Sequence, residues 1–227
     1  MKCLFFVLMM IGFGVNAGAQ VINWDEVTVK DSAGTIYKTA AWQAMYSTGK
    51  YELSLTQDQK TGFLRRFSEA EYNAKIASMP KPTPSQYFTT GDKIAAFSGT
   101  DIKDKAFDIA KLTGKVVVLN FWFINCPPCR MEIPSLNEML EGYKNRKDVV
   151  FLGIALDPKA SLEQFLPGNP FNYNIVANGG YIAQKYGVNS YPTHVVINKQ
   201  GKVVFHTSGL AMTTVPWVKK SIDEALK

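Results

Sequence analysis

The sequence predicts an α/β fold in which a central mixed sheet is flanked by helices and follows a small N-terminal α+β region. Residues 115–123 and 149–156 are apolar runs of strand length, typical of strands that are buried on both faces. Helical and strand-like segments alternate from there to the C-terminus, which favours a sheet covered by helices. A proline-rich stretch separates this part from residues 20–79, whose segments are shorter and mixed.

The N-terminus has the features of an export signal. Lys2 precedes an apolar stretch over residues 4–15, and small residues occupy positions 17–19. We predict a signal peptide over residues 1–19 that is cleaved before Gln20. An uncleaved membrane anchor is the alternative, although the apolar stretch is short for a bilayer. Export predicts a periplasmic or otherwise extracytoplasmic protein that is soluble after cleavage and keeps two of its three cysteines.

The region after the signal is predicted to hold short strands and one helix. Strands are expected near residues 27–29 and 49–55, with a turn over 31–34 after the first. Ser68 is placed to be the N-cap of a short helix, and Glu71 is its partner in a capping box. The role of this region does not follow from its sequence.

Three prolines between residues 80 and 84 favour an extended, semi-rigid linker. We place a linker over residues 80–90 and a second domain over residues 91–227. Within that domain, the patterns predict strands over 115–123, 149–156, 174–177, 193–198 and 202–207, and helices over 127–146, 161–166, 180–186 and 214–225.

The charge pattern argues against nucleic acid as a partner. The chain has 227 residues and a formal net charge of +6, but its basic residues are scattered and form no run longer than a pair. Nucleic-acid binding would favour a dense basic stripe with interleaved aromatic residues. A mildly basic, solvated surface is the expectation.

The chemistry is predicted to reside in Cys126-Pro127-Pro128-Cys129, which follows the first buried strand and opens a helix. A helix N-terminus offers unpaired N–H groups and a positive dipole end, and both favour the thiolate. Cys126, nearer the helix start and the solvent, should attack a disulfide, and Cys129 should resolve the mixed disulfide. Pro127 and Pro128 suit a first helical turn, where a missing N–H costs little.

Other uses of this motif fit the sequence less well. A zinc site needs about four ligands, whereas the mature chain has two cysteines and two distant histidines. Covalent haem attachment would require His where Arg130 stands. A purely structural disulfide remains open, but so small a loop constrains the unfolded chain little. We therefore expect no metal and no cofactor.

Residues 117–134, VVLNFWFINCPPCRMEIP, resemble the active-site segment of thioredoxins, and most of all that of the exported TlpA/ResA branch. Tyr191-Pro192-Thr193 and Gly201 extend the resemblance, which covers about residues 91–226. It implies a thioredoxin-like fold and thiol–disulfide oxidoreductase activity. It does not explain residues 20–90.

The resemblance also implies roles for residues around the cysteines. Pro192 matches the family's cis-proline, which lies beside the disulfide and turns the backbone of Tyr191 toward an incoming peptide. Of Phe121 and Trp122 on the central strand, one is expected in the core and the other near the rim of the active site. We assign substrate binding to five residues: Tyr191, Pro192, Pro127, Pro128 and Trp122.

Departures from the family pattern point to Glu132. Thioredoxins proper carry a buried Asp where this chain has Asn120, and Asn cannot accept a proton at neutral pH. The TlpA/ResA branch instead resembles this chain in having Glu132, almost one helical turn after Cys129. Glu132 is therefore predicted to be catalytic, as a relay for the thiol proton. A solvated helix residue is the alternative.

Two further positions carry expectations of their own. Asn125 stands where the family usually has Trp, which puts the substrate surface in doubt. His194 is interpreted as a packed sheet residue and not as a catalytic one.

By resemblance, the expected function is dithiol–disulfide exchange with protein thiols outside the cytoplasm. The direction implied is reductive, fed by a membrane electron donor, as in cytochrome c maturation or a similar process. Alternatives are a disulfide-introducing oxidase or isomerase, a partner-binding module in which the thioredoxin-like domain is mainly scaffold, and, more distantly, peroxide reduction.

Overall fold

The structure is a computed structural model and describes residues 22–227. The predicted signal peptide lies outside the described residues. Among the helices that are described, none combines the length and the apolar character that crossing a membrane would require.

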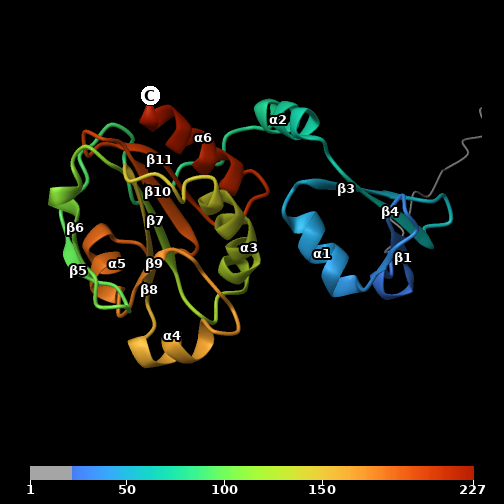
Figure 1. The fold of residues 1–227 in the computed structure, drawn as a ribbon, viewed down its shortest axis with the longest axis horizontal. Coiled ribbons are helices and arrows are strands. Elements are labelled where there is room, and N and C mark those ends of the chain that lie inside the picture. The colour runs from blue at the N-terminus through green and yellow to red at the C-terminus, as the bar shows by residue number, and fades with distance from the viewer. Residues whose placement is uncertain (1–21) are drawn as a thin grey trace, which may run out of the picture.

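The N-terminal region is a small α+β unit, as predicted (Figure 1). Its sheet has the order β2-β1-β4-β3. The strands are β1 (Thr28–Lys30), β2 (Ile36–Tyr37), β3 (Tyr51–Leu55) and β4 (Thr61–Arg66), and the helices are η1 (Trp24–Glu26), α1 (Thr39–Ser47) and α2 (Glu69–Ser78). The elements η1, β2, β4 and α1 were not predicted from the sequence. The capping box at the start of α2 is confirmed, because the Ser68 and Glu71 side chains each accept from the other residue's backbone N–H.

Residues 79–97 contain no helix or named strand; they include turns near residues 86 and 90 and an isolated bridge between Lys93 and Lys202. The segment is hydrogen-bonded to the second sheet. Thr207 Oγ1 donates to the carbonyl of Thr83 at 2.8 Å, and Ser85 Oγ lies 3.1 Å from His206 Nδ1. These contacts tie the segment to the edge of the second sheet.

The second sheet has five strands in the order β11-β10-β7-β8-β9. β7, β8 and β9 run parallel, β10 is antiparallel to β7, and β11 is antiparallel to β10. Its strands are β7 (Val116–Trp122), β8 (Val149–Ala155), β9 (Asn174–Val176), β10 (Thr193–Ile197) and β11 (Val203–Ser208). A hairpin of β5 (Ser98–Thr100) and β6 (Ala106–Asp108) and the short helix η2 (Ile109–Leu112) precede it.

Four helices accompany this sheet: α3 (Pro127–Glu141), α4 (Lys159–Phe165), α5 (Gly180–Tyr186) and α6 (Thr214–Leu226). The predicted strands and helices of this domain are all present. α3 ends five residues earlier than predicted, because the helix closes at Gly142, whose N–H bonds back to Met139 and Leu140.

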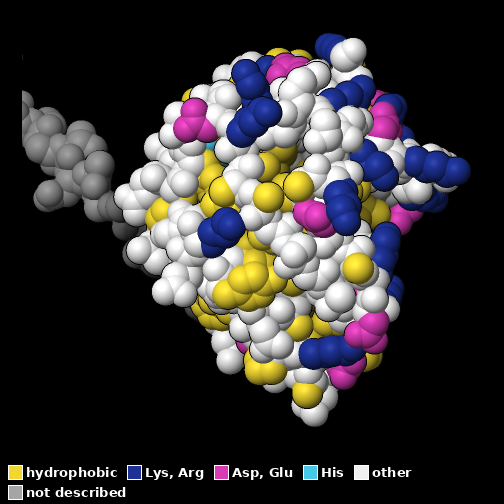
Figure 2. All heavy atoms as spheres, turned by 90° about the vertical axis from the view of Figure 1, so that its left-hand side faces the viewer, with side chains coloured by type: hydrophobic (Ala, Val, Ile, Leu, Met, Phe, Trp, Pro, Cys, Tyr) yellow, Lys and Arg dark blue, Asp and Glu magenta, His cyan; other side chains and the backbone are white. Residues whose placement is uncertain are grey.

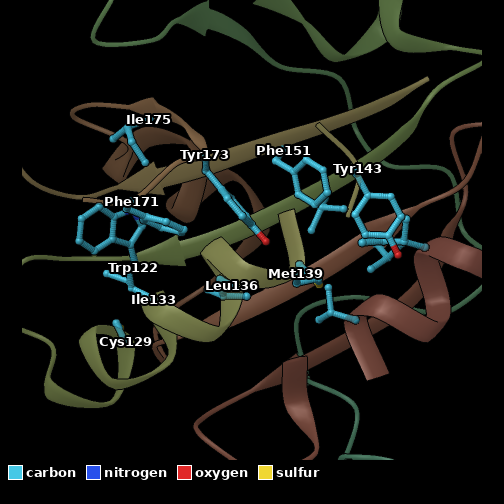
Figure 3. Close-up of a cluster of buried hydrophobic side chains, with 14 of the residues drawn as sticks. Trp122, Cys129, Ile133, Leu136, Met139, Tyr143, Phe151, Phe171, Tyr173 and Ile175 are labelled. Carbon is cyan, nitrogen blue, oxygen red and sulfur yellow. The ribbon is translucent and has the colours of Figure 1, made fainter. Parts of the chain in front are cut away.

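The sheet is covered on both faces, and β7 is buried along its whole length. Alternate residues of β7 point to opposite faces. Val116, Val118 and Trp122 share a core with α3 and α6, whereas Val117, Leu119 and Phe121 share one with α5. Figure 3 shows the first core, in which Cys129, Ile133 and Leu136 follow one another along α3 beside Trp122. The active-site helix is thus seated directly on the sheet.

The outer surface near α5 and the β5–β6 hairpin is mixed in character. Figure 2 shows Lys and Arg side chains spread over this face in small groups, between acidic and apolar side chains.

Candidate functional site: a dithiol turn at the start of helix α3

Cys126 and Cys129 form a disulfide at the junction of β7 and α3. Cys126 is the N-cap residue of α3, and its sulfur accepts the backbone N–H of Cys129 at 3.2 Å. Pro127 and Pro128 occupy the first two helical positions, where no N–H is needed. A sulfur held at this place faces free N–H groups and the positive end of the helix, so a negative charge on Cys126 is stabilised.

Exposure does not distinguish the two cysteines. Both are 2 % exposed in the disulfide form, so the expectation that Cys126 lies nearer the solvent is not met. The difference between them is electrostatic: Cys126 is the residue whose sulfur receives a backbone N–H.

The turn that carries Cys126 is anchored by a residue that sequence reasoning missed. The Asp157 carboxylate accepts the N–H of Ile124 at 2.8 Å, and the Leu156 N–H bonds to the carbonyl of Trp122. Asp157 follows β8, which is parallel to β7, so both strands deliver their next residues to the same sheet edge. A polar residue directly after the second buried strand was the signal available in the sequence.

Glu132 is buried, with 3 % of its surface exposed, so the alternative of a solvated helix residue is wrong. Its Oε1 lies 2.7 Å from His194 Nε2 and accepts from Asn120 Nδ2 at 3.2 Å. His194 is a fully buried residue of β10, as expected for a sheet residue, but it also binds the predicted catalytic carboxylate. His194 directly follows Pro192-Thr193 on a strand beside the cysteines, and this position in the sequence could have indicated that it lies near the site.

The Tyr191–Pro192 peptide bond is cis, as the resemblance implied. Pro192 is buried and Tyr191 is half-buried. The Tyr191 ring meets the half-buried Phe123 edge to face, with ring centroids 5.5 Å apart. Neither the backbone N–H nor the carbonyl of Tyr191 has a hydrogen-bond partner among residues 22–227. This rim therefore offers an aromatic surface and open backbone groups.

The expectation that Trp122 lies at the rim is wrong. Trp122 and Phe121 are both fully buried, because helices cover both faces of β7. The Trp122 ring packs edge to face on Phe171 at 5.3 Å, as Figure 3 shows. Phe123, one residue beyond the strand, is the aromatic side chain that reaches the rim. Pro127 is exposed and Pro128 half-buried at the same edge.

A cavity of about 1000 Å³ lies between the N-terminal region and helices α3 and α6. Its lining includes Tyr46, Ile76, Met131, Glu132, Leu210 and Met212. Tyr46, Met131, Leu210 and Met212 are among the large apolar side chains that are exposed. The cavity therefore has an apolar rim and begins on the active-site helix.

Within residues 22–227, no cluster of three or more His, Cys, Asp or Glu side chains is placed to hold a metal ion. The chemistry that this site carries directly is that of its sulfur pair and the buried carboxyl behind it.

Comparison with known proteins identifies the family. The family model described as AhpC/TSA family matches residues 90–206, which is more than half of the chain. The thiol-disulfide oxidoreductase ResA of Halalkalibacterium halodurans is 30% identical over 122 residues, covering 53% of this chain and 69% of that protein. ResA of Bacillus thuringiensis subsp. konkukian is 30% identical over 148 residues, covering 62% and 82%.

Solved structures give the same picture. The Chlorobium tepidum protein assigned as thiol:disulfide interchange protein DsbE matches with a TM-score of 0.56 and 29% identity, covering 61% of this chain and 99% of that one. A thioredoxin family thiol:disulfide interchange protein from Chlorobium tepidum TLS matches at 0.52 and 25% identity, covering 62% and 99%. The chain therefore belongs to the thioredoxin-like AhpC/TSA family, and it is a thiol–disulfide oxidoreductase of the ResA type.

Proposed function

We propose that the protein exchanges disulfides with protein thiols through Cys126 and Cys129, with Glu132 as the proton acceptor. The observation that carries this proposal is the position of Cys126 as the N-cap of α3, in a disulfide with Cys129, which lies almost one turn before a buried carboxyl. Thiolate chemistry is favoured at that position, and a resolving thiol stands within reach.

In the reducing direction, the Cys126 thiolate attacks a sulfur of the substrate disulfide, and the other substrate sulfur leaves as a thiolate. Cys129 gives its proton to Glu132, and its sulfur then attacks Cys126. The bond between Cys126 and the substrate breaks, and the substrate's second thiolate is released. Two electrons have passed to the substrate, and Cys126–Cys129 is a disulfide again.

The rim beside the disulfide is the proposed substrate-binding surface. The unpaired backbone groups of Tyr191 can pair with an extended peptide, and the rings of Tyr191 and Phe123 can pack on it. Pro127 and Pro128 form the opposite edge of this surface.

We propose a reductive role outside the cytoplasm, fed by a membrane electron donor, with exported thiols such as cytochrome c haem-binding cysteines as substrates. The resemblance to the TlpA/ResA branch and the predicted signal peptide support it. A disulfide-introducing oxidase or isomerase is the alternative direction.

The reduction potential of the Cys126–Cys129 pair distinguishes the two directions. Equilibration with a glutathione or dithiothreitol buffer should give a value near the thioredoxin level of about −270 mV for a reductant. A value near about −120 mV would contradict the reductive role and favour an oxidant. In either case Cys126→Ser should lose exchange activity entirely.

The cavity beside α3 favours a second element of function, in which residues 22–79 help to recognise the protein partner. Its apolar rim combines Tyr46 of α1 with Met131 of α3, and so continues from the dithiol turn to the N-terminal region. An apolar segment of the substrate protein would bury these side chains.

Met212→Glu tests this element, because it places a charge on the rim. The variant should exchange normally with a small disulfide and slowly with a protein substrate. Ile36→Glu is the matched control: Ile36 is 68% exposed but lies on β2 and does not line the cavity. Equal loss in both variants, or none in Met212→Glu, would remove the cavity rim from recognition.

A further inference from the structure

Three buried polar side chains meet beneath the active-site helix. Asn120 on β7 is 1% exposed, Glu132 on α3 is 3% exposed, and His194 on β10 is fully buried. His194 and Asn120 are directly paired across the antiparallel strands. Asn120 shares its face of β7 with Val118 and Trp122, which pack against α3. The sheet thus presents an amide and an imidazole to the one carboxyl group on the buried face of α3.

The two oxygens of Glu132 have different surroundings. Oε1 receives both donors, His194 Nε2 at 2.7 Å and Asn120 Nδ2 at 3.2 Å. Oε2 is buried and has no hydrogen-bond partner among the described residues. A buried carboxyl oxygen without a donor is costly, so the side chain must be held in this orientation by its other contacts.

The contacts fit one tautomer of His194. An imidazole that carries its proton on Nε2 donates to Glu132 Oε1. Asn120 Nδ2 lies 3.2 Å from both ring nitrogens, and in this tautomer Nδ1 is the one that can accept from it. Asn120 has two N–H groups and can therefore donate to Glu132 and to His194 together. Of the buried side-chain nitrogens and oxygens of these three residues, Oε2 is the one without a hydrogen-bond partner among the described residues.

We infer that His194 is a positioning residue for the exchange reaction: it holds Oε1 of Glu132, so that Oε2 is the oxygen that takes the Cys129 proton. This inference rests on the proposed function. In the step itself, the S–H bond of Cys129 breaks and its proton forms an O–H bond with Oε2. The Cys129 sulfur bonds to Cys126, and the electron pair of the broken mixed disulfide leaves with the substrate sulfur.

Glu132 lies between the sheet and a cavity. It is one of the residues that line the cavity between α3 and the N-terminal region, while Oε2 itself is buried. The titratable groups near it are Cys129 on its own helix, His194 on β10, and Tyr173, and burial together with the charge of Glu132 raises the pKa of the Tyr173 hydroxyl. Across the cavity the charged groups are Lys50 paired with Glu138, Lys219 paired with Asp223, and Arg66, Glu69, Lys220, Glu224 and Lys227.

The test measures how fast a mixed disulfide on Cys126 is resolved, as the release of a small thiol over a range of pH. His194→Leu removes both nitrogens at similar volume and should slow release roughly tenfold, with a changed pH dependence. His194→Gln keeps an N–H donor and should recover most of the rate. In a Glu132→Gln background, His194→Leu should have no further effect, because it acts through Glu132. His206→Gln is the matched control and should behave as wild type.

Two outcomes separate this inference from the function on which it rests. If His194→Leu releases the small thiol at the wild-type rate and Cys129→Ser releases none, the role of His194 is overturned and disulfide exchange stands. Release by Cys129→Ser at the wild-type rate would overturn both. Histidine ¹⁵N spectroscopy on the wild-type protein needs no variant at His194: the Nε2-protonated tautomer is expected, and the Nδ1-protonated tautomer would overturn the inference even if His194→Leu does not fold.

Discussion

The two sheets of this molecule differ in how they are covered. The N-terminal sheet has a small core of four buried residues, Val27, Val29, Trp42 and Leu64, and its neighbour α2 buries none of its side chains. The second sheet has a core on each face, and every residue of β7 is buried. Buried polar groups such as Glu132 and His194 need fixed partners, so they are found where both faces are closed. Among the described residues, none of the buried polar or charged side chains belongs to the N-terminal region.

The largest expected difference between the regions is in stability. Leu136→Ala, in the core below α3, should lower the free energy of unfolding by about 4 kcal/mol, whereas Leu64→Ala should cost only about 2 kcal/mol, because its thin core can close around the gap. Denaturant unfolding measures both. Leu64→Ala should also exchange normally with a small disulfide, and loss of that activity would contradict the separation of roles.

Glu132→Gln sharpens the comparison at the site. The amide is nearly isosteric and cannot take the proton, so exchange should slow roughly a hundredfold and the pH dependence of Cys129 alkylation should change. Glu138→Gln is the matched control, since Glu138 is on the same helix but pairs with Lys50 at the surface. Identical alkylation curves for wild type and Glu132→Gln would leave water as the proton acceptor.

Ser68→Ala tests the N-terminal region alone. Loss of the capping box of α2 should cost about 1 kcal/mol, because the N–H of Glu71 loses its acceptor. Ser78→Ala, at the other end of α2, should cost less. Thermal unfolding distinguishes them, and exchange with a small disulfide should be unaffected in both. Equal shifts would mean that the box does not stabilise this helix.

The smallest effect is expected where the linker meets the second sheet. Burial, and then the charge of Lys81, lowers the pKa of His206. The folded protein then binds this proton less readily than the unfolded chain, so the contribution to stability is present above about pH 6.5 and is lost as the pH falls. His206→Gln should reduce the loss of Tm between about pH 8 and about pH 5. An unchanged loss would mean that other groups cause the acid sensitivity.

Local patterns in the sequence predicted the second domain well. The apolar runs of β7 and β8 and the helix over residues 180–186 have the expected positions, because long periodic segments carry a strong signal. The N-terminal strand β4 was missed. Only Gly62 and Leu64 are buried in it, and Arg65 and Arg66 read as loop residues. Helix α1 was missed because Lys38 gives it no side-chain cap.

At the site, the sequence predicted what is local and missed what depends on register. Cys126, Cys129 and Glu132 lie on one helix, so their spacing already placed them together. The contact of His194 with Glu132 depends on the pairing of β10 with β7, which joins residues 74 positions apart. Trp122 was assigned to the rim because neighbouring residues of a strand point to opposite faces, whereas both faces of β7 are buried.

The most direct test of the central claim is to map the mixed disulfide of the Cys129→Ser variant. The reduced variant is incubated with a disulfide-bonded protein substrate, and the adduct is digested and analysed by mass spectrometry without reduction. We predict a stable adduct whose substrate cysteine is bonded to Cys126, and none with Cys126→Ser. Absence of any adduct, together with wild-type reduction of the substrate by both variants, would contradict the assignment of Cys126 and Cys129 as the working groups.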